Sequence, residues 1–153
     1  MDTVRRIGID ARIFGTQHGG IGRYCQKLLP QIFELDKFNQ YFIFFNRRMV
    51  NLDELSVFDK FANARLIEAN IRHYSIGEQV RFHRLLNKYN LDLVHFTNFN
   101  VPVLYKRPFV VTIHDMVHHK IGGAKKSHWL HFQAYKKIIE NAGKQARLII
   151  TVS

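Results

Sequence analysis

The chain of 153 residues contains a single cysteine, Cys25, and only three prolines. One cysteine excludes an internal disulfide framework and a cysteine-rich zinc site. The apolar runs at 41–45 and 109–113 fall far short of the ~18 residues that a membrane-spanning helix requires. The first residues lead into a strand-like stretch with no apolar segment or cleavage site, so we expect no signal peptide. With 46% hydrophobic residues, these absences favour one ordered domain in the cytoplasm.

Acidic residues are also scarce, with 12 Asp and Glu against 23 Lys and Arg and a net charge of +11. Such a charge attracts phosphate-bearing partners, which include nucleic acid, anionic lipid headgroups and nucleotide substrates. The basic residues occur as scattered pairs, which is typical of a solvated surface. No Asp-x-Asp pair occurs, which disfavours the metal-dependent kind of nucleotide-sugar site.

Short apolar runs alternate with longer amphipathic ones along the chain. They predict strands at 6–10, 41–45, 64–69, 91–96, 108–114 and 147–152, and helices at 21–35, 75–89 and 127–143. Pro30 should kink or split the first helix, and Ser75 with Glu78 matches a capping box that opens the second. Apolar strands alternating with helices predict a doubly wound, mostly parallel, Rossmann-like α/β sheet. Ligands bind such sheets at the carboxyl ends of the strands, so we expect the site after the first, fourth and fifth strands.

A glycine-rich segment at 19–24, Gly-Gly-Ile-Gly-Arg-Tyr, follows the first predicted strand and opens the first helix. Glycines let a backbone approach a ligand, and a helix N-terminus offers free N–H groups and a positive dipole to a phosphate. The segment lacks the Gly-x-Gly-x-x-Gly spacing of dinucleotide-binding loops. Gly19, Gly20 and Gly22 therefore indicate either a phosphate-binding turn or a plain flexible turn.

His114 ends an apolar strand and places a titratable imidazole at the expected ligand-binding edge. This histidine either contacts substrate, which we favour, or belongs to a structural polar network. A metal site with His118 and His119 is a third alternative. The zinc-like spacing of His114 and His118 spans a strand end and a loop rather than a helix, which argues against it.

Residues 95–100, His-Phe-Thr-Asn-Phe-Asn, leave the fourth strand with amides between aromatic rings. Amides and aromatic faces suit sugar hydroxyls and sugar rings, although asparagine is equally common in ordinary loops. Cys25 lies on the apolar face of a predicted helix, which indicates a buried, inert thiol rather than a nucleophile.

Five short segments of the chain, each of them a loose pattern by itself, are specific when they are taken together in their order and spacing. They are 7–12 (Ile-Gly-Ile-Asp-Ala-Arg), 19–24, 92–96 (Asp-Leu-Val-His-Phe), 111–115 (Val-Thr-Ile-His-Asp) and 150–153 (Ile-Thr-Val-Ser). Together they resemble the N-terminal half of a family 4 glycosyltransferase of the GT-B fold, and among these the bacterial mannosyltransferases most. The resemblance covers essentially the whole chain.

The resemblance implies a retaining transfer of a sugar, with mannose favoured, from GDP-mannose or a UDP-sugar to a glycan or lipid-linked acceptor, as in bacterial polysaccharide synthesis. It implies no cofactor beyond this nucleotide sugar and no metal. It also implies the roles of individual residues: His114 as the catalytic residue; Gly19, Gly20 and Gly22 at the donor diphosphate; Arg12, Asn98, Asn100 and Asp115 at the acceptor.

The same resemblance implies that a donor-nucleotide domain with a Glu-x7-Glu motif is absent, since no two of the five glutamates are eight residues apart. Residues 1–153 would then be the acceptor-side domain, inactive alone. The chain stops where a strand ends and a serine would cap the next helix, so we expect a longer partner. The retained alternative is a basic nucleic-acid-binding or membrane-binding α/β module without catalysis. Peripheral attachment to the inner face of the membrane is compatible with the enzyme as well.

Overall fold

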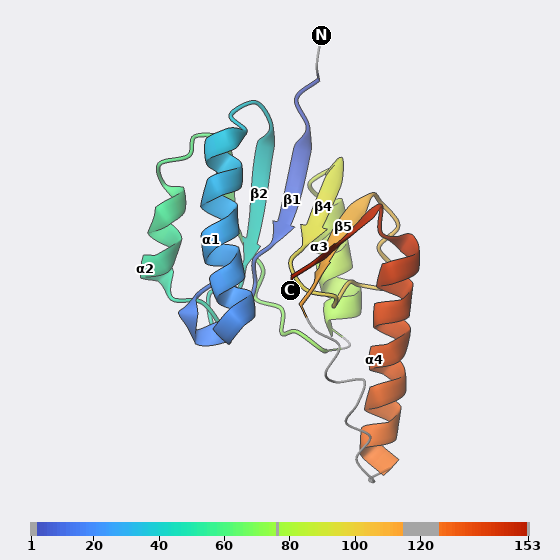
Figure 1. Cartoon of the computed structure of the whole chain (residues 1–153). Coiled ribbons are helices and arrows are strands. Elements are labelled where there is room, and N and C mark those ends of the chain that lie inside the picture. The colour runs from blue at the N-terminus through green and yellow to red at the C-terminus, as the bar shows by residue number, and fades with distance from the viewer. Residues whose placement is uncertain (1–2, 76, 115–125, 153) are drawn as a thin grey trace.

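Six parallel strands form the centre of the molecule in the order β3-β2-β1-β4-β5-β6 (Figure 1). The structure, a computed structural model, describes residues 3–75, 77–114 and 126–152. The strands are β1 (Arg6–Asp10), β2 (Gln40–Phe45), β3 (Ala64–Glu68), β4 (Leu93–Phe96), β5 (Phe109–Ile113) and β6 (Leu148–Thr151). The doubly wound α/β prediction is confirmed, because the order reverses beside β1 as it does in Rossmann-like sheets.

Helices or helical turns connect these strands except β4 and β5, which follow one another directly. The helices are α1 (Gly19–Leu35), α2 (Leu52–Leu55), α3 (His83–Asn87) and α4 (Lys126–Gln145), with short turns η1 (Thr16–His18) and η2 (Ser56–Phe58) and a π-helical turn η3 (Glu78–Phe82). Pro30 lies inside α1 without splitting it. Cys25, Leu29 and Phe33 are fully buried on both sides of this proline, and their burial offsets the one backbone hydrogen bond that proline removes.

The remaining helices differ in detail from their sequence predictions. The helix predicted at 75–89 is the π-helical turn η3 followed by α3. Helix α4 begins at Lys126, one residue before the predicted start at Ser127. The short elements α2 and η2 were not predicted, because a single helical turn leaves no repeated apolar spacing to recognise.

Two hydrophobic clusters lie on opposite faces of the sheet. The first packs α1, α2 and η2 against β1 and β2 and includes Ile9, Cys25 and Ile43. The second packs η3, α3 and α4 against the other face and includes Phe44 and Phe82. Cys25 is buried as predicted, and this burial raises the pKa of its thiol to about 12, so the group is neutral at physiological pH.

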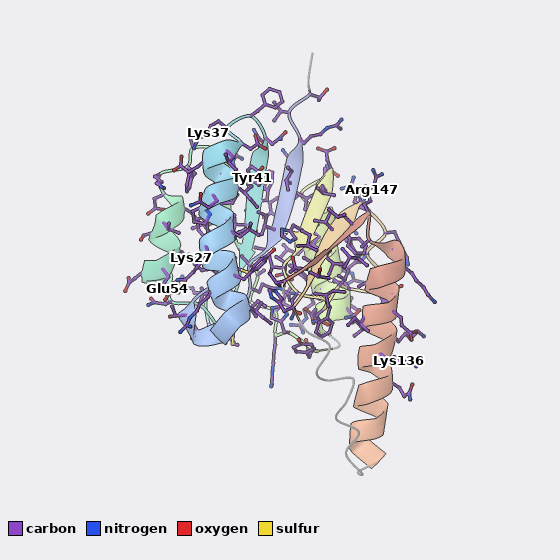
Figure 2. The ribbon with its side chains drawn as sticks, viewed as in Figure 1. Lys27, Lys37, Tyr41, Glu54, Lys136 and Arg147 are labelled. Carbon is purple, nitrogen blue, oxygen red and sulfur yellow. The ribbon has the colours of Figure 1, made fainter. Side chains whose placement is uncertain are left out.

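Exposed basic side chains are spread over separate elements. Figure 2 shows Lys27 on α1, Lys37 just past its end, Lys136 on α4 and Arg147 before β6. Among the described helices, none combines the length and the apolar character needed to cross a membrane.

Candidate functional site

The carboxyl ends of β1, β4 and β5 lie side by side and bring three loops together. Thr97, just after β4, donates its hydroxyl to the carbonyl of Asp10 at 2.6 Å. The carbonyl of Thr97 lies 2.8 Å from Nε2 of His114, just after β5. Thr97 therefore ties the end of β1 to the end of β5, and the predicted edge is the place where the predicted site residues meet.

Arg12 lies at the centre of a buried ion cluster on the β1 side of this edge. Its Nε and Nη2 donate to both carboxylate oxygens of Asp10 at 2.8 and 2.7 Å. Nη2 also lies 2.6 Å from Oε1 of Glu78, and the guanidinium stacks 3.6 Å from the centre of the Phe82 ring. The side chains of Arg12 and Glu78 are both 0% exposed. We name Asp10, Arg12 and Glu78 the Arg12 cluster.

Asp10 and Arg12 hold each other in their charged forms although both are buried. Burial alone would raise the pKa of Asp10, but the attraction and hydrogen bonds of Arg12 outweigh it and hold that pKa below its ordinary value. Burial alone would lower the pKa of Arg12, and the two carboxylates outweigh it and raise that pKa. Asp10 and Arg12 therefore depend on each other for their charged forms, which makes the cluster an interdependent unit.

Glu78 connects the Arg12 cluster to the loop after β4. Its Oε2 accepts from the side-chain amide of Asn100 and, at 2.8 Å, from the backbone N–H of Tyr74. Ser75 Oγ accepts from the N–H of Glu78 at 3.1 Å, as the capping box predicts. Glu78 thus holds both the segment before η3, through Tyr74, and the loop after β4, through Asn100. Tyr74 adopts a left-handed backbone with φ 58°, a conformation that needs such support.

The two predicted acceptor asparagines lie along this loop. Asn98 donates to the hydroxyl of Tyr74 at 3.1 Å and accepts from the N–H of Phe99 at 2.8 Å. Oδ1 of Asn100 is buried and has no hydrogen-bond partner in the part of the chain that the structure describes. Nε2 of His73, whose ring lies beside Glu78, is likewise buried and has no hydrogen-bond partner among the described residues. Buried polar atoms of this kind are usually satisfied by water or a ligand.

His114 presents a different environment on the β5 side. A carbonyl only accepts, so the neutral ring carries its proton on Nε2 and donates it to Thr97. The Tyr24 ring meets the His114 ring edge-on, with 4.9 Å between centroids. Over the described ranges, no residue bonds Nδ1 of this partly exposed side chain. His114 therefore has a fixed orientation and one nitrogen available to a ligand.

A chain of hydrogen bonds supports the contact between Tyr24 and His114. Thr112 Oγ1 lies 3.2 Å from the Tyr24 hydroxyl and 2.8 Å from Nε2 of His95. Burial lowers the pKa of His95 to about 4, with a smaller opposing effect from Asp10. His95 is therefore neutral at pH 7 and serves as a hydrogen-bonding group behind the site.

The glycine segment divides into an open and a packed part. A Cβ added to Gly19 or Gly20 would meet no heavy atom within 4 Å, whereas one added to Gly22 would lie 1.9 Å from the carbonyl oxygen of Gly15. No side-chain hydrogen bond caps the start of α1. Gly19 and Gly20 thus leave room at a helix N-terminus, while Gly22 is needed for packing.

Sequence reasoning missed Glu78, Tyr74 and Tyr24 as parts of the site. Glu78 was recognised only as a helix cap, and nothing in the sequence relates it to Arg12, which lies 66 residues away. Asp115, His118 and His119 lie outside the described residues. Among the residues that are described, no group of three or more His, Cys, Asp or Glu side chains could hold a metal ion.

Comparison with known proteins yields no match, either to a family model or to a curated protein sequence. The fold and the site define a Rossmann-like α/β protein with a polar carboxyl edge. The function therefore has to be argued from this edge.

Proposed function

We propose that the chain is the acceptor-side domain of a retaining, family 4 type glycosyltransferase. The enzyme transfers a sugar, with mannose favoured, from GDP-mannose or a UDP-sugar to a glycan or lipid-linked acceptor. One observation carries the proposal: Tyr24 joins the glycine segment to His114. Gly20 precedes Tyr24 by four residues, about one helical turn, so the start of α1 lies about one turn from the ring that contacts His114.

Each of these groups has a proposed role in the transfer. The bond between the sugar C1 and the diphosphate oxygen breaks, a bond from the acceptor oxygen to C1 forms, the proton of the acceptor hydroxyl passes to the departing diphosphate oxygen, and the nucleoside diphosphate leaves. The start of α1 at Gly19 and Gly20 faces the negative diphosphate, and the N–H of Gly20 donates to it, since the N–H of Gly19 donates to the carbonyl of Thr16. Nδ1 of His114 accepts a hydrogen bond from a hydroxyl of the donor sugar, and this contact speeds the reaction only as far as it strengthens in the transition state.

The acceptor residues fall into two kinds in this proposal. Tyr74 forms the exposed surface that meets acceptor hydroxyls, and the buried Asn98 holds the Tyr74 hydroxyl. Arg12 and Asn100 lie behind it, because the guanidinium is 0% exposed and Asn100 bonds Glu78. Arg12 thus positions the acceptor loop through Glu78. The predicted contact of Asp115 with the acceptor remains part of the proposal.

The donor nucleotide would be bound by a second domain, which also stabilises the leaving diphosphate. The proposal requires no metal and no cofactor beyond the nucleotide sugar. It places the reaction in the cytoplasm, at the inner face of the membrane when the acceptor is lipid-linked.

Sugar transfer tests the proposal directly. The isolated chain, incubated with GDP-mannose or UDP-glucose and lipid-linked acceptors, should give no turnover, and turnover would contradict the need for a second domain. In protein joined to a donor-nucleotide domain, His114→Ala should lower kcat by about 10- to 1000-fold, or about 1.4–4 kcal/mol, with little change in thermal stability. His83→Ala on α3 is the matched control and should keep full activity.

Three results would count against the proposal. An equally active His114→Ala protein would remove the catalytic role, and an unfolded one would show that the ring is structural. Nucleic-acid binding that falls steeply with salt, without transfer to any acceptor, would favour the basic binding module instead.

A further inference from the structure

A hollow lies beside the end of β3, apart from the glycine segment and His114. Its volume is about 330 Å³, and its walls are the segment 68–71 on one side and Arg81, Arg84 and Lys88 of η3, α3 and the following turn on the other. This volume is within the range of small-molecule sites, roughly 300–1,000 Å³. We call it the basic groove.

The three cations of the basic groove have no carboxylate partner. Within the described residues, none of Arg81, Arg84 and Lys88 forms an ion pair. Glu68 lines the same hollow, but its carboxylate accepts from the side-chain amide of Asn70 instead. Like charges gathered on one helix face repel one another. An anion bound between these three side chains would lower this repulsion.

Three other exposed lysines, by contrast, each have a carboxylate partner. Lys37 and Lys60 both bond Glu34, at 3.0 and 2.9 Å, and Lys136 lies 3.8 Å from Glu140. The sheet carries a further cation on the same side: Arg65 pairs in register with Phe42, so it lies on the sheet face that α3 covers.

The other groove residues suit a ligand that is more than a bare anion. Asn70 is fixed, because its Oδ1 accepts from the N–H of Arg47 at 3.0 Å, and Glu68 supplies carboxylate oxygens that accept from hydroxyl groups. Ile71 and Leu85, both partly buried against the core, give the hollow an apolar part. We propose that the basic groove binds a phosphate ester of a polyol or sugar, with the phosphate on Arg81 and Arg84 and the hydroxyls on Glu68 and Asn70.

Ile71 connects this groove to the candidate site. Its side chain lines the hollow, and its carbonyl accepts from Nη1 of Arg12 at 3.3 Å. Apart from Ile71, the residues that line the basic groove are different from those of the candidate site at the carboxyl edge, so the groove is a separate site. Its occupation does not depend on the proposed sugar transfer.

Titration of the chain with glucose 6-phosphate, glucose and inorganic phosphate at constant ionic strength tests the inference. Amide resonances of 68–71 and 81–88 should shift with glucose 6-phosphate, which should bind at least tenfold more tightly than either glucose or phosphate. Arg81→Gln with Arg84→Gln should weaken that binding at least tenfold. The control Lys137→Gln with Lys144→Gln removes the same charge from exposed positions of α4 and should change the affinity less than twofold.

Vesicles distinguish the two sources of such an ester. Binding to phosphatidylglycerol but not phosphatidylcholine vesicles, lost in the Arg81/Arg84 variant, would support the site and assign it to a lipid headgroup. Binding of the soluble ester alone would support it and assign a metabolite. Three results would overturn the proposal: no binding of either source, equal losses in the α4 control, or tighter groove-dependent binding of a short oligonucleotide. Both variants change exposed side chains, and thermal melting confirms that they fold.

Discussion

The two sides of the carboxyl edge use polar groups in opposite ways. On the β1 side, Arg12 is enclosed and all its charge is balanced by Asp10 and Glu78. On the β5 side, His114 is partly exposed and its ring is held through Nε2 and the Tyr24 edge. Enclosed charges hold loops in place, whereas a partly exposed ring with a free nitrogen suits chemistry. The comparison teaches that burial separates the residues predicted for one site into two kinds. Buried ones such as Arg12 hold the loops in place, and partly exposed ones such as His114 can contact a ligand.

Removing Arg12 should give the largest effect on stability. Arg12→Met leaves Asp10 and Glu78 buried without their cation, which should cost about 3–5 kcal/mol and lower the Tm by about 6–20 °C. Urea unfolding and thermal melting measure both quantities. Lys27→Met on the surface of α1 (Figure 2) removes the same charge and should change stability by less than about 0.5 kcal/mol.

His114→Ala completes this first comparison on the other side of the edge. It should cost less than about 1 kcal/mol, because the ring is partly exposed and loses a single hydrogen bond. Equal losses for Arg12→Met and His114→Ala would contradict the division between support and contact.

Lowering the pH should weaken the fold through His95, which lies on β4 between the two sides. Its pKa is about 4 in the folded chain and about 6.5 when unfolded. Between these values the unfolded chain binds a proton that the folded chain does not, so stability should fall from pH 6.5 to pH 4 by up to about 3 kcal/mol. Asp10 has a lowered pKa, so its contribution is present above about pH 4 and is lost below.

Urea unfolding at pH 7.0 and pH 4.5 measures the contribution of His95. His95→Gln removes the titrating ring and should reduce the difference in unfolding free energy between the two pH values. An unchanged difference would show that His95 protonates in the folded state as easily as in the unfolded one.

Local patterns predicted the fold but only part of the site. The apolar runs of the strands and the spacing on α1 depend on the sequence itself, so the parallel sheet and its ligand-binding edge followed from them. The ion pair between Arg12 and Glu78 depends on η3 crossing the end of β1, which no local spacing encodes. Asp10 and Arg12 are two residues apart, yet only the fold shows that they form a buried, hydrogen-bonded ion pair.

The same contrast between packed and open positions occurs within the glycine segment. Gly22→Ala should cost about 1–3 kcal/mol, because its Cβ would overlap the backbone carbonyl of Gly15. Gly20→Ala meets open space and should stabilise α1 by up to about 1 kcal/mol. Chemical denaturation compares the two variants, and similar losses would contradict the packing difference.

In protein joined to a donor-nucleotide domain, Gly20→Val should raise the KM for the donor or abolish turnover while the fold survives, because a side chain there would occupy the place that we propose for the diphosphate. Normal kinetics of the Gly20→Val protein would show that the glycine segment is only a turn and does not bind the donor.

Tyr24→Phe should give a small effect, because it removes one hydroxyl and keeps the ring against His114. The bond to Thr112 is 3.2 Å long and partly buried, so its loss should cost about 0.5–1.5 kcal/mol. Thr112 keeps its contact with His95 at 2.8 Å, which limits the loss. Nitrogen chemical shifts of the His114 imidazole should still report a proton on Nε2, since Thr97 fixes that tautomer. A shift of the proton to Nδ1 would mean that the tyrosine hydroxyl, rather than the Thr97 carbonyl, sets which nitrogen faces a ligand.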